Sequence, residues 1–212
     1  MPRLREVSRA EVTDERITFY YDAVFGKERD PVVEHGTESG TSGNWWTVHA
    51  LSPEVFRHVT SGFALYRNAR LDPVLRELGQ SRAGWARGSQ FVYSQHCKQL
   101  RALGTSEERI AAVPHWPVAD CYSPIERTVL AYTDCLVLAS GRVPDALFAE
   151  LRSELDDEQI LLFTYIISMY DMHATISRAL RLEYDDVADR VVEVAAPEGF
   201  GNRDMTAVLD RS

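Results

Sequence analysis

The stretch SQFVYSQHCKQLRALG, residues 89–104, says most about how this chain folds. Ser89 is a typical residue to cap the start of a helix, and Gly104 is a typical residue to end one. Between these ends, three apolar side chains and one histidine recur at helical spacing: Val92, His96, Leu100 and Leu103. The stretch therefore predicts a short amphipathic helix that carries a histidine on its apolar face.

His96 is the residue of this helix that suggests chemistry. An imidazole titrates near neutral pH, and partial removal from water suits it to general acid–base catalysis. The competing interpretation is a core histidine whose ring is satisfied by a neighbouring carbonyl group, and the residue pattern alone gives the two equal weight.

Residues that start and end helices recur along the rest of the chain, and their pattern predicts an all-α fold. Capping residues stand before proline at Ser52-Pro53, Asp72-Pro73 and Ser123-Pro124, and Thr105 with Glu108 has the spacing of a capping box. Helices are predicted over residues 14–25, 52–68, 74–87, 90–103, 105–113, 123–141, 144–155 and 158–182. Only residues 187–196 are ambiguous between strand and coil. We expect a single helical domain over residues 1–185 and a partly docked tail over residues 186–212.

Composition indicates which classes of binding partner and which cellular compartment to expect. The net charge of −9 argues against a nucleic-acid ligand. The N-terminus has no signal-peptide pattern, and the longest apolar run, residues 160–170, is too short to span a bilayer. Three cysteines without a C-x-x-C pair fit reduced thiols, and we see no metal site. We expect a cytoplasmic protein that acts on a small molecule, with no nucleic-acid or membrane partner.

Several tryptophans lie at bends and helix ends, where aromatic side chains often wall a ligand pocket. Trp45 and Trp46 follow a glycine-rich loop and precede His49, and Trp85 lies near the end of a predicted helix. We take these four residues as candidates for substrate binding. The alternative is that the tryptophans are packing residues that anchor the loop.

Two residues near His96 on the same helix are further candidates. Tyr93 lies one turn before His96, so its hydroxyl is a candidate partner in catalysis. Cys97 follows His96 directly and points about 100° away around the helix, which orients a Cys–His dyad poorly. We therefore read Cys97 as a buried small residue that at most contributes to the substrate pocket.

The order of these segments resembles the carboxymuconolactone decarboxylase and alkylhydroperoxidase-D superfamily over about residues 50–185. The resemblance is carried by short segments in register: residues 71–79 (LDPVLRELG), the aromatic-x-x-x-His pattern of the His96 helix, residues 103–110 (LGTSEERI), residues 123–134 (SPIERTVLAYTD), residues 156–160 (DDEQI) and residues 170–172 (YDM). It implies an all-helical bundle built on a helical hairpin, assembly into dimers, trimers or hexamers, and an active site beside His96.

The resemblance implies two possible classes of activity, thiol peroxidase and lyase. Thiol peroxidases of this family use C-x-x-C followed by histidine, whereas the lyases lack the cysteine pair. Ser89 and Val92 stand at the two cysteine positions here, and Val92 also replaces a glutamate that many relatives carry four residues before the histidine. On this basis we expect no Glu–His proton relay at this point of the chain.

Three hypotheses follow. The first is a cofactor-independent lyase, decarboxylase or isomerase that acts on a small cyclic or aromatic carboxylate or lactone, with His96 as the acid–base group and Tyr93 as its hydroxyl partner. The second is an alkylhydroperoxidase-like antioxidant protein that uses Cys97. The third is a ligand-binding relative without catalytic activity.

Overall fold

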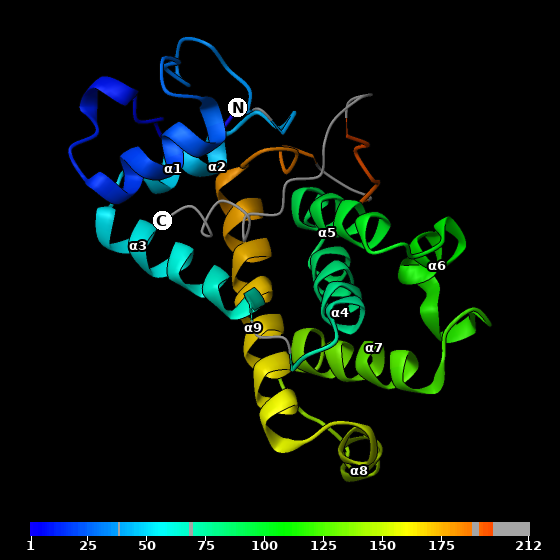
Figure 1. The fold of residues 1–212 in the computed structure, drawn as a ribbon. Helices are drawn as coiled ribbons and strands as arrows, with labels where there is room; N and C mark the ends of the chain where they lie inside the picture. The colour runs from blue at the N-terminus through cyan, green and yellow to red at the C-terminus, as the bar shows by residue number, and fades with distance from the viewer. Residues whose placement is uncertain (38, 68–69, 188–190, 197–212) are drawn as a thin grey trace. The chain divides into compact units, whose positions relative to one another are not determined.

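The computed structural model describes residues 1–37, 39–67, 70–187 and 191–196, and the regular structure within them is helical (Figure 1). The α-helices are α1 (Glu15–Phe25), α2 (Asn44–His49), α3 (Pro53–Ser61), α4 (Pro73–Ala86), α5 (Gln90–Ala102), α6 (Glu107–Ala112), α7 (Pro124–Val137), α8 (Asp145–Glu154) and α9 (Asp157–Leu180). Short 3-10 helices are η1 (Arg9–Glu11), η2 (Gly62–Arg67) and η3 (Val113–Val118). The predicted all-α class is confirmed.

Most of the predicted helix caps hold the helices that the sequence assigned to them. Side chains of Ser52, Asp72, Ser89 and Ser123 accept hydrogen bonds from first-turn amides of α3, α4, α5 and α7. Asp14, which was not predicted as a cap, does the same for α1. Each such bond satisfies a backbone N–H that the helix itself leaves without an acceptor.

The predicted cap at Thr105 is wrong. The amide of Thr105 donates to the carbonyl oxygen of Leu100, which closes the end of α5 beyond the left-handed Gly104 (φ +80°). Ser106 therefore starts α6, and its hydroxyl accepts a hydrogen bond from the amide of Arg109.

The chain divides into two compact units, which we describe separately. The first comprises residues 1–67 and 177–187, and the second comprises residues 70–176 and 191–195. A compact unit within a chain need not fold alone, so the single domain expected over residues 1–185 stays a prediction.

The second unit is built on the hairpin of α4 and α5, which pack closely because glycine faces the partner helix. A Cβ added at Gly84 would lie 2.7 Å from the backbone nitrogen of Tyr93. A Cβ at Gly79 would lie 2.6 Å from side-chain atoms of Ile167 and Phe163 on α9. Glycine thus lets α4 lie directly against both α5 and α9.

Helix α9 is the core helix of this unit. By length and composition alone it could cross a membrane, and about 44% of its apolar window is buried. Phe163 and Ile167 pack against α4, and Thr164 hydrogen-bonds Tyr132 of α7 at 2.8 Å. Helix α9 is apolar because one of its faces packs against α4 and α7 in this way.

Part of the expected tail lies along α5. The amide of Val194 donates to the hydroxyl of Ser94 at 2.9 Å, and Glu193 forms an ion pair with Arg101. Residues 188–190 and 197–212 of the tail lie outside the described residues.

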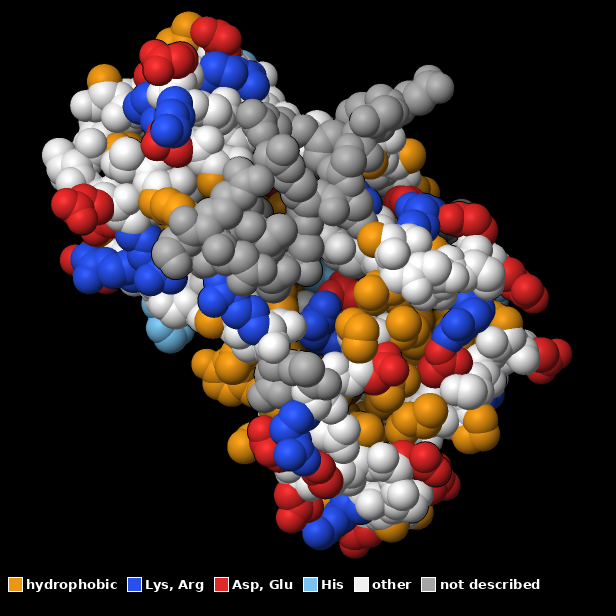
Figure 2. Space-filling model, in the orientation of Figure 1, with side chains coloured by type: hydrophobic (Ala, Val, Ile, Leu, Met, Phe, Trp, Pro, Cys, Tyr) orange, Lys and Arg blue, Asp and Glu red, His pale blue; other side chains and the backbone are white. Residues whose placement is uncertain are grey.

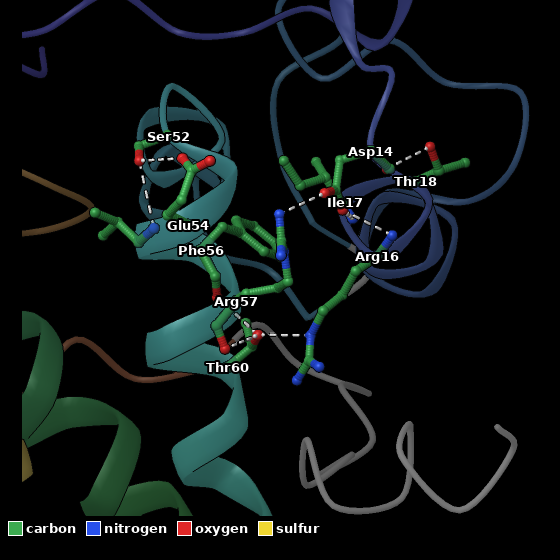
Figure 3. A network of polar contacts seen from close by, with 10 residues as sticks. Asp14, Arg16, Ile17, Thr18, Ser52, Glu54, Phe56, Arg57 and Thr60 are labelled. Carbon is green, nitrogen blue, oxygen red and sulfur yellow. Dashed lines mark hydrogen bonds and ion pairs between the residues drawn. The ribbon is translucent and has the colours of Figure 1, made fainter.

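The first unit is held by an aromatic core and by polar contacts between α1 and α3. Tyr20 of α1 stacks on Trp46 of α2, with ring centroids 5.4 Å apart. Figure 3 shows Arg16 of α1 donating to the hydroxyl of Thr60 on α3 at 3.0 Å, and Arg57 of α3 reaching Asp14, the cap of α1. Acidic and basic side chains are interspersed over the face drawn in Figure 2.

Helix α2 has no counterpart among the predicted helices, because residues 27–47 read as a loop. Its first turn is completed by a distant residue. The carboxylate of Glu183 accepts hydrogen bonds from the hydroxyl of Ser42 and from the amides of Gly43 and Trp45, at 2.7, 3.1 and 2.9 Å. The amide of Glu183 in turn donates to the side chain of Asn44 at 2.6 Å. A long-range contact of this kind is invisible to local sequence patterns.

Candidate active site

The histidine that the sequence singled out is paired with a carboxylate from the other helix of the hairpin. Nδ1 of His96 on α5 lies 2.6 Å from Oε2 of Glu77 on α4. Both side chains are buried, with 7% and 4% of their surface exposed. A carboxylate accepts, so Nδ1 carries the hydrogen and donates it, and Nε2 is the ring nitrogen outside this hydrogen bond.

Glu77 is held from its other side by the residue before it. Nε and Nη2 of Arg76 donate to Oε1 of Glu77 at 3.1 and 2.8 Å. Burial raises the pKa of Glu77, but the contacts with His96 and then Arg76 outweigh it and bring the pKa below its usual value. The carboxylate therefore stays ionised and fixes the imidazole through a charge-assisted hydrogen bond.

Helix α9 supplies aromatic neighbours to this pair. The ring of Tyr170 meets the imidazole of His96 at right angles, with centroids 4.4 Å apart. His173, one turn later and also buried, lies 5.3 Å from the Tyr170 ring by centroids. Three helices thus converge on His96.

Tyr93 and Cys97 lie with a different group of residues. Both belong to the apolar cluster that includes Leu78 and Leu100, and the Tyr93 hydroxyl bonds to the Cys97 thiol. Burial raises the pKa of the Cys97 thiol to about 12. The tyrosine ring in contact with His96 is that of Tyr170, so a catalytic role for Tyr93 stays a prediction.

The predicted aromatic walls are divided between the two units. Trp85 of the second unit packs on the same apolar cluster as Cys97, with the guanidinium of Arg82 4.6 Å from its ring. In the first unit, Trp45 stacks on His49 with centroids 4.2 Å apart. Nδ1 of His49 donates to the carbonyl oxygen of Trp45 at 2.7 Å, and burial lowers the pKa of His49. Substrate binding by these residues, and by Trp46, stays a prediction.

No glutamate stands four residues before His96, as expected, but a glutamate from another helix reaches the imidazole. The expectation rested on Val92, which is a buried core residue, while the hydroxyl of Ser89 caps α5 by accepting from the Val92 amide. The carboxylate comes instead from α4, nineteen residues before the histidine. The signal in the sequence was a charged pair, Arg76-Glu77, set between Leu75 and Leu78 in a helix that must bury one face.

Comparison with known proteins supports the resemblance. Residues 53–134, which contain the Glu77–His96 pair, match the carboxymuconolactone decarboxylase family. The match covers 82 of the 212 residues, so this segment of the chain is similar to the carboxymuconolactone decarboxylase family. The segment lacks the C-x-x-C pair of the superfamily's peroxidases, because Ser89 and Val92 occupy those positions.

Individual proteins are similar to this chain in sequence or in fold. The uncharacterized protein YdfG of Bacillus subtilis (strain 168) is 28% identical over 133 residues, which are 62% of this chain and 90% of YdfG. A solved Agrobacterium tumefaciens protein, named as a candidate antioxidant defence protein AhpD, is 26% identical with a TM-score of 0.60 and covers 69% of this chain and 97% of its own. A peroxidase-related protein of Ralstonia eutropha JMP134 with an AhpD core shares the fold at 18% identity, with a TM-score of 0.64 over 86% of this chain and 95% of its own.

Proposed function

We propose that this protein is a cofactor-independent lyase, decarboxylase or isomerase of the carboxymuconolactone decarboxylase type. Its substrate would be a small cyclic or aromatic carboxylate or lactone, and His96 would be the acid–base group. The observation that carries the proposal is the buried hydrogen bond between Nδ1 of His96 and Oε2 of Glu77.

The pair has the parts that proton transfer requires. With Nδ1 bound to the carboxylate, Nε2 is the atom that takes a proton from the substrate and later returns it. The negative charge of Glu77 stabilises the imidazolium formed between these steps, and its position keeps the imidazole in the right tautomer. An isomerase needs no more than this proton shuttle and a way to stabilise the intermediate anion.

A decarboxylation would use the same groups in a different order. The bond between the substrate and its carboxylate breaks, carbon dioxide leaves, and the electron pair passes into an unsaturated or carbonyl group of the substrate as an enolate. Protonated His96 then delivers its proton to the carbon that lost carbon dioxide. The substrate is the electron sink, so the proposed reaction uses no organic cofactor.

The peroxidase alternative is weaker because of the state of Cys97. A peroxidatic cysteine must react as an accessible thiolate. Cys97 is fully buried, is bonded to the Tyr93 hydroxyl, and has a raised pKa. A cysteine in this environment is a structural residue.

The test is a screen of cyclic carboxylates and lactones as substrates. Turnover is monitored by ultraviolet absorbance and by the release of carbon dioxide. H96Q and E77Q should lose activity on any substrate found, while H115Q, which changes an exposed histidine, should retain it. Equal activity in H96Q and the parent protein would contradict the proposal. Binding without turnover in the parent protein would favour the ligand-binding alternative, and hydroperoxide reduction that is lost in C97S would favour the antioxidant one.

We also propose that the working form is a homo-oligomer in the cytoplasm, with a small molecule as its only other partner. The support is a row of exposed apolar side chains along α9, formed by Leu161, Tyr165 and Met172. Sedimentation at micromolar concentration should give a mass above the 24.0 kDa of one chain. A stable monomer would contradict this proposal and leave the catalytic one standing.

A further inference from the structure

Arg76 and His96 bind the two oxygens of the same carboxylate, that of Glu77. The guanidinium takes Oε1 through two hydrogen bonds, and the imidazole takes Oε2 through one. The guanidinium itself is buried, with 9% of the side chain exposed. A buried cation that faces the carboxylate from the side opposite the base contributes to the charge balance of the whole group.

The formal charges of Arg76, Glu77 and His96 show how the arginine affects the protonation of the pair. With Arg76 present, an ionised Glu77 and a neutral His96 give a buried group of zero net charge. A second proton on His96 would leave a net positive charge away from water, which is costly. Without the arginine, the protonated pair is the neutral form, so the pair would take up a proton more readily.

We propose that Arg76 is a positioning residue that keeps His96 an uncharged base beside an ionised carboxylate. This inference rests on the isomerase form of the proposed function, in which an uncharged His96 first takes a proton from the substrate. Among the contacts described for His96, Glu77 and Arg76 of α4 supply the charge. Tyr170 of α9 contacts the imidazole and His173 contacts the Tyr170 ring, and on α5 itself burial keeps Tyr93 and Cys97 protonated.

The experiment reads the imidazole directly and needs no substrate. Protein labelled with ¹⁵N in histidine is titrated, and the pH midpoint at which the His96 ring nitrogens take up the second proton is followed by NMR. R76Q keeps a polar side chain but removes the charge, and its midpoint should move up by about one pH unit. R76K keeps the charge and should stay much closer to the parent protein.

Two further variants complete the test. E77Q leaves the arginine without its carboxylate, so the midpoint should move down. R82Q removes another buried guanidinium of the second unit, the partner of Asp134, and should leave the midpoint of His96 in place.

The inference is overturned if the midpoint of R76Q does not rise, if R76K moves as far as R76Q, or if R82Q moves it equally. Should R76Q not fold, a midpoint that fails to fall in E77Q overturns it. Failure of the proposed function is a separate result, because it would be seen as unchanged turnover in H96Q.

Discussion

His49 in the first unit and His96 in the second unit are both buried histidines on helices, yet they have different partners. His49 donates to the carbonyl oxygen of Trp45 in its own helix and stacks on that residue's ring. His96 donates to a carboxylate that a different helix supplies. The first arrangement satisfies a polar group within the core, and the second pairs the imidazole with a group that carries a negative charge.

Burial on an apolar face alone therefore does not distinguish a histidine bonded to a carbonyl group from one bonded to a carboxylate. A neutral carbonyl group offsets little of the cost of charging a buried imidazole, and burial lowers the pKa of His49 accordingly. An ionised carboxylate offsets much more of that cost. The acceptor of the histidine's hydrogen bond, a carbonyl oxygen or a carboxylate oxygen, is therefore the feature that distinguishes the two histidines.

The largest expected difference between the two histidines is in turnover. H96Q should lower turnover by about 10²–10⁴-fold, because it removes the proton-transfer group while keeping similar volume. H49Q should lower stability and change turnover far less. Steady-state rates on a substrate from the screen measure both, and circular dichroism confirms that each variant is folded. An H49Q loss as large as that of H96Q would erase the distinction.

The next effect is on stability. E77A should lower the free energy of unfolding by about 3–5 kcal/mol, because it leaves Arg76 and His96 buried without their common acceptor. The matched control is E107A, which removes an exposed carboxylate paired with Arg101 and should cost about 0.2–1 kcal/mol. Urea unfolding compares the two, and similar losses would mean that the buried pair contributes no more than a surface one.

The two units should lose stability in different pH windows. Burial places the pKa of His49 below its ordinary 6.5, so the unfolded chain binds the proton first and stability falls as the pH drops below about 6.5. The pKa of Glu77 is below its ordinary 4.5, so its contribution is complete above about 4.5 and is lost as the pH falls further.

Unfolding measured at a series of pH values separates these windows. H49Q should flatten the profile just below pH 6.5, and E77Q should flatten it below pH 4.5, each relative to the parent protein. A profile for H49Q that runs parallel to the parent in the upper window would show that His49 keeps its proton affinity on folding.

The smallest expected effect is at Cys97, the residue next to His96. C97S should leave turnover nearly unchanged, because the thiol faces the apolar cluster and bonds to Tyr93. Thiol reagents should label Cys121 and Cys135 of the native protein before Cys97, since Cys97 alone is fully buried. Rapid labelling of Cys97 with parallel loss of activity would restore the peroxidase hypothesis.

Local signals predicted the fold well, because caps, prolines and glycines act within one turn of the residues that carry them. Asp72, Ser89 and Ser123 start helices where the sequence placed them. Local signals failed where a partner came from elsewhere in the chain. Helix α2 is capped by Glu183, and His96 is hydrogen-bonded to Glu77, and neither contact can be predicted from neighbouring residues.

The candidate site was predicted only in its central residue. The periodicity of α5 placed His96 on a buried face, but periodicity does not say which residue of another helix meets it. Arg76 and Glu77 read as ordinary charges of a helix until the close packing allowed by Gly84 brings α4 against α5. Tyr170 lies on α9, far along the chain; it contributes to the family resemblance but was not predicted to lie beside His96.

Glu183, which caps α2, has a consequence for the time course of synthesis. It lies 138 residues after Trp45, whose amide it accepts. At a translation rate of about 5–20 residues per second, roughly 7–28 s pass on the ribosome before the cap of α2 exists. During that interval Trp45 and Trp46 belong to a six-residue helix too short to persist alone, so the nascent first unit exposes these aromatic side chains. The first unit begins synthesis first and is completed last.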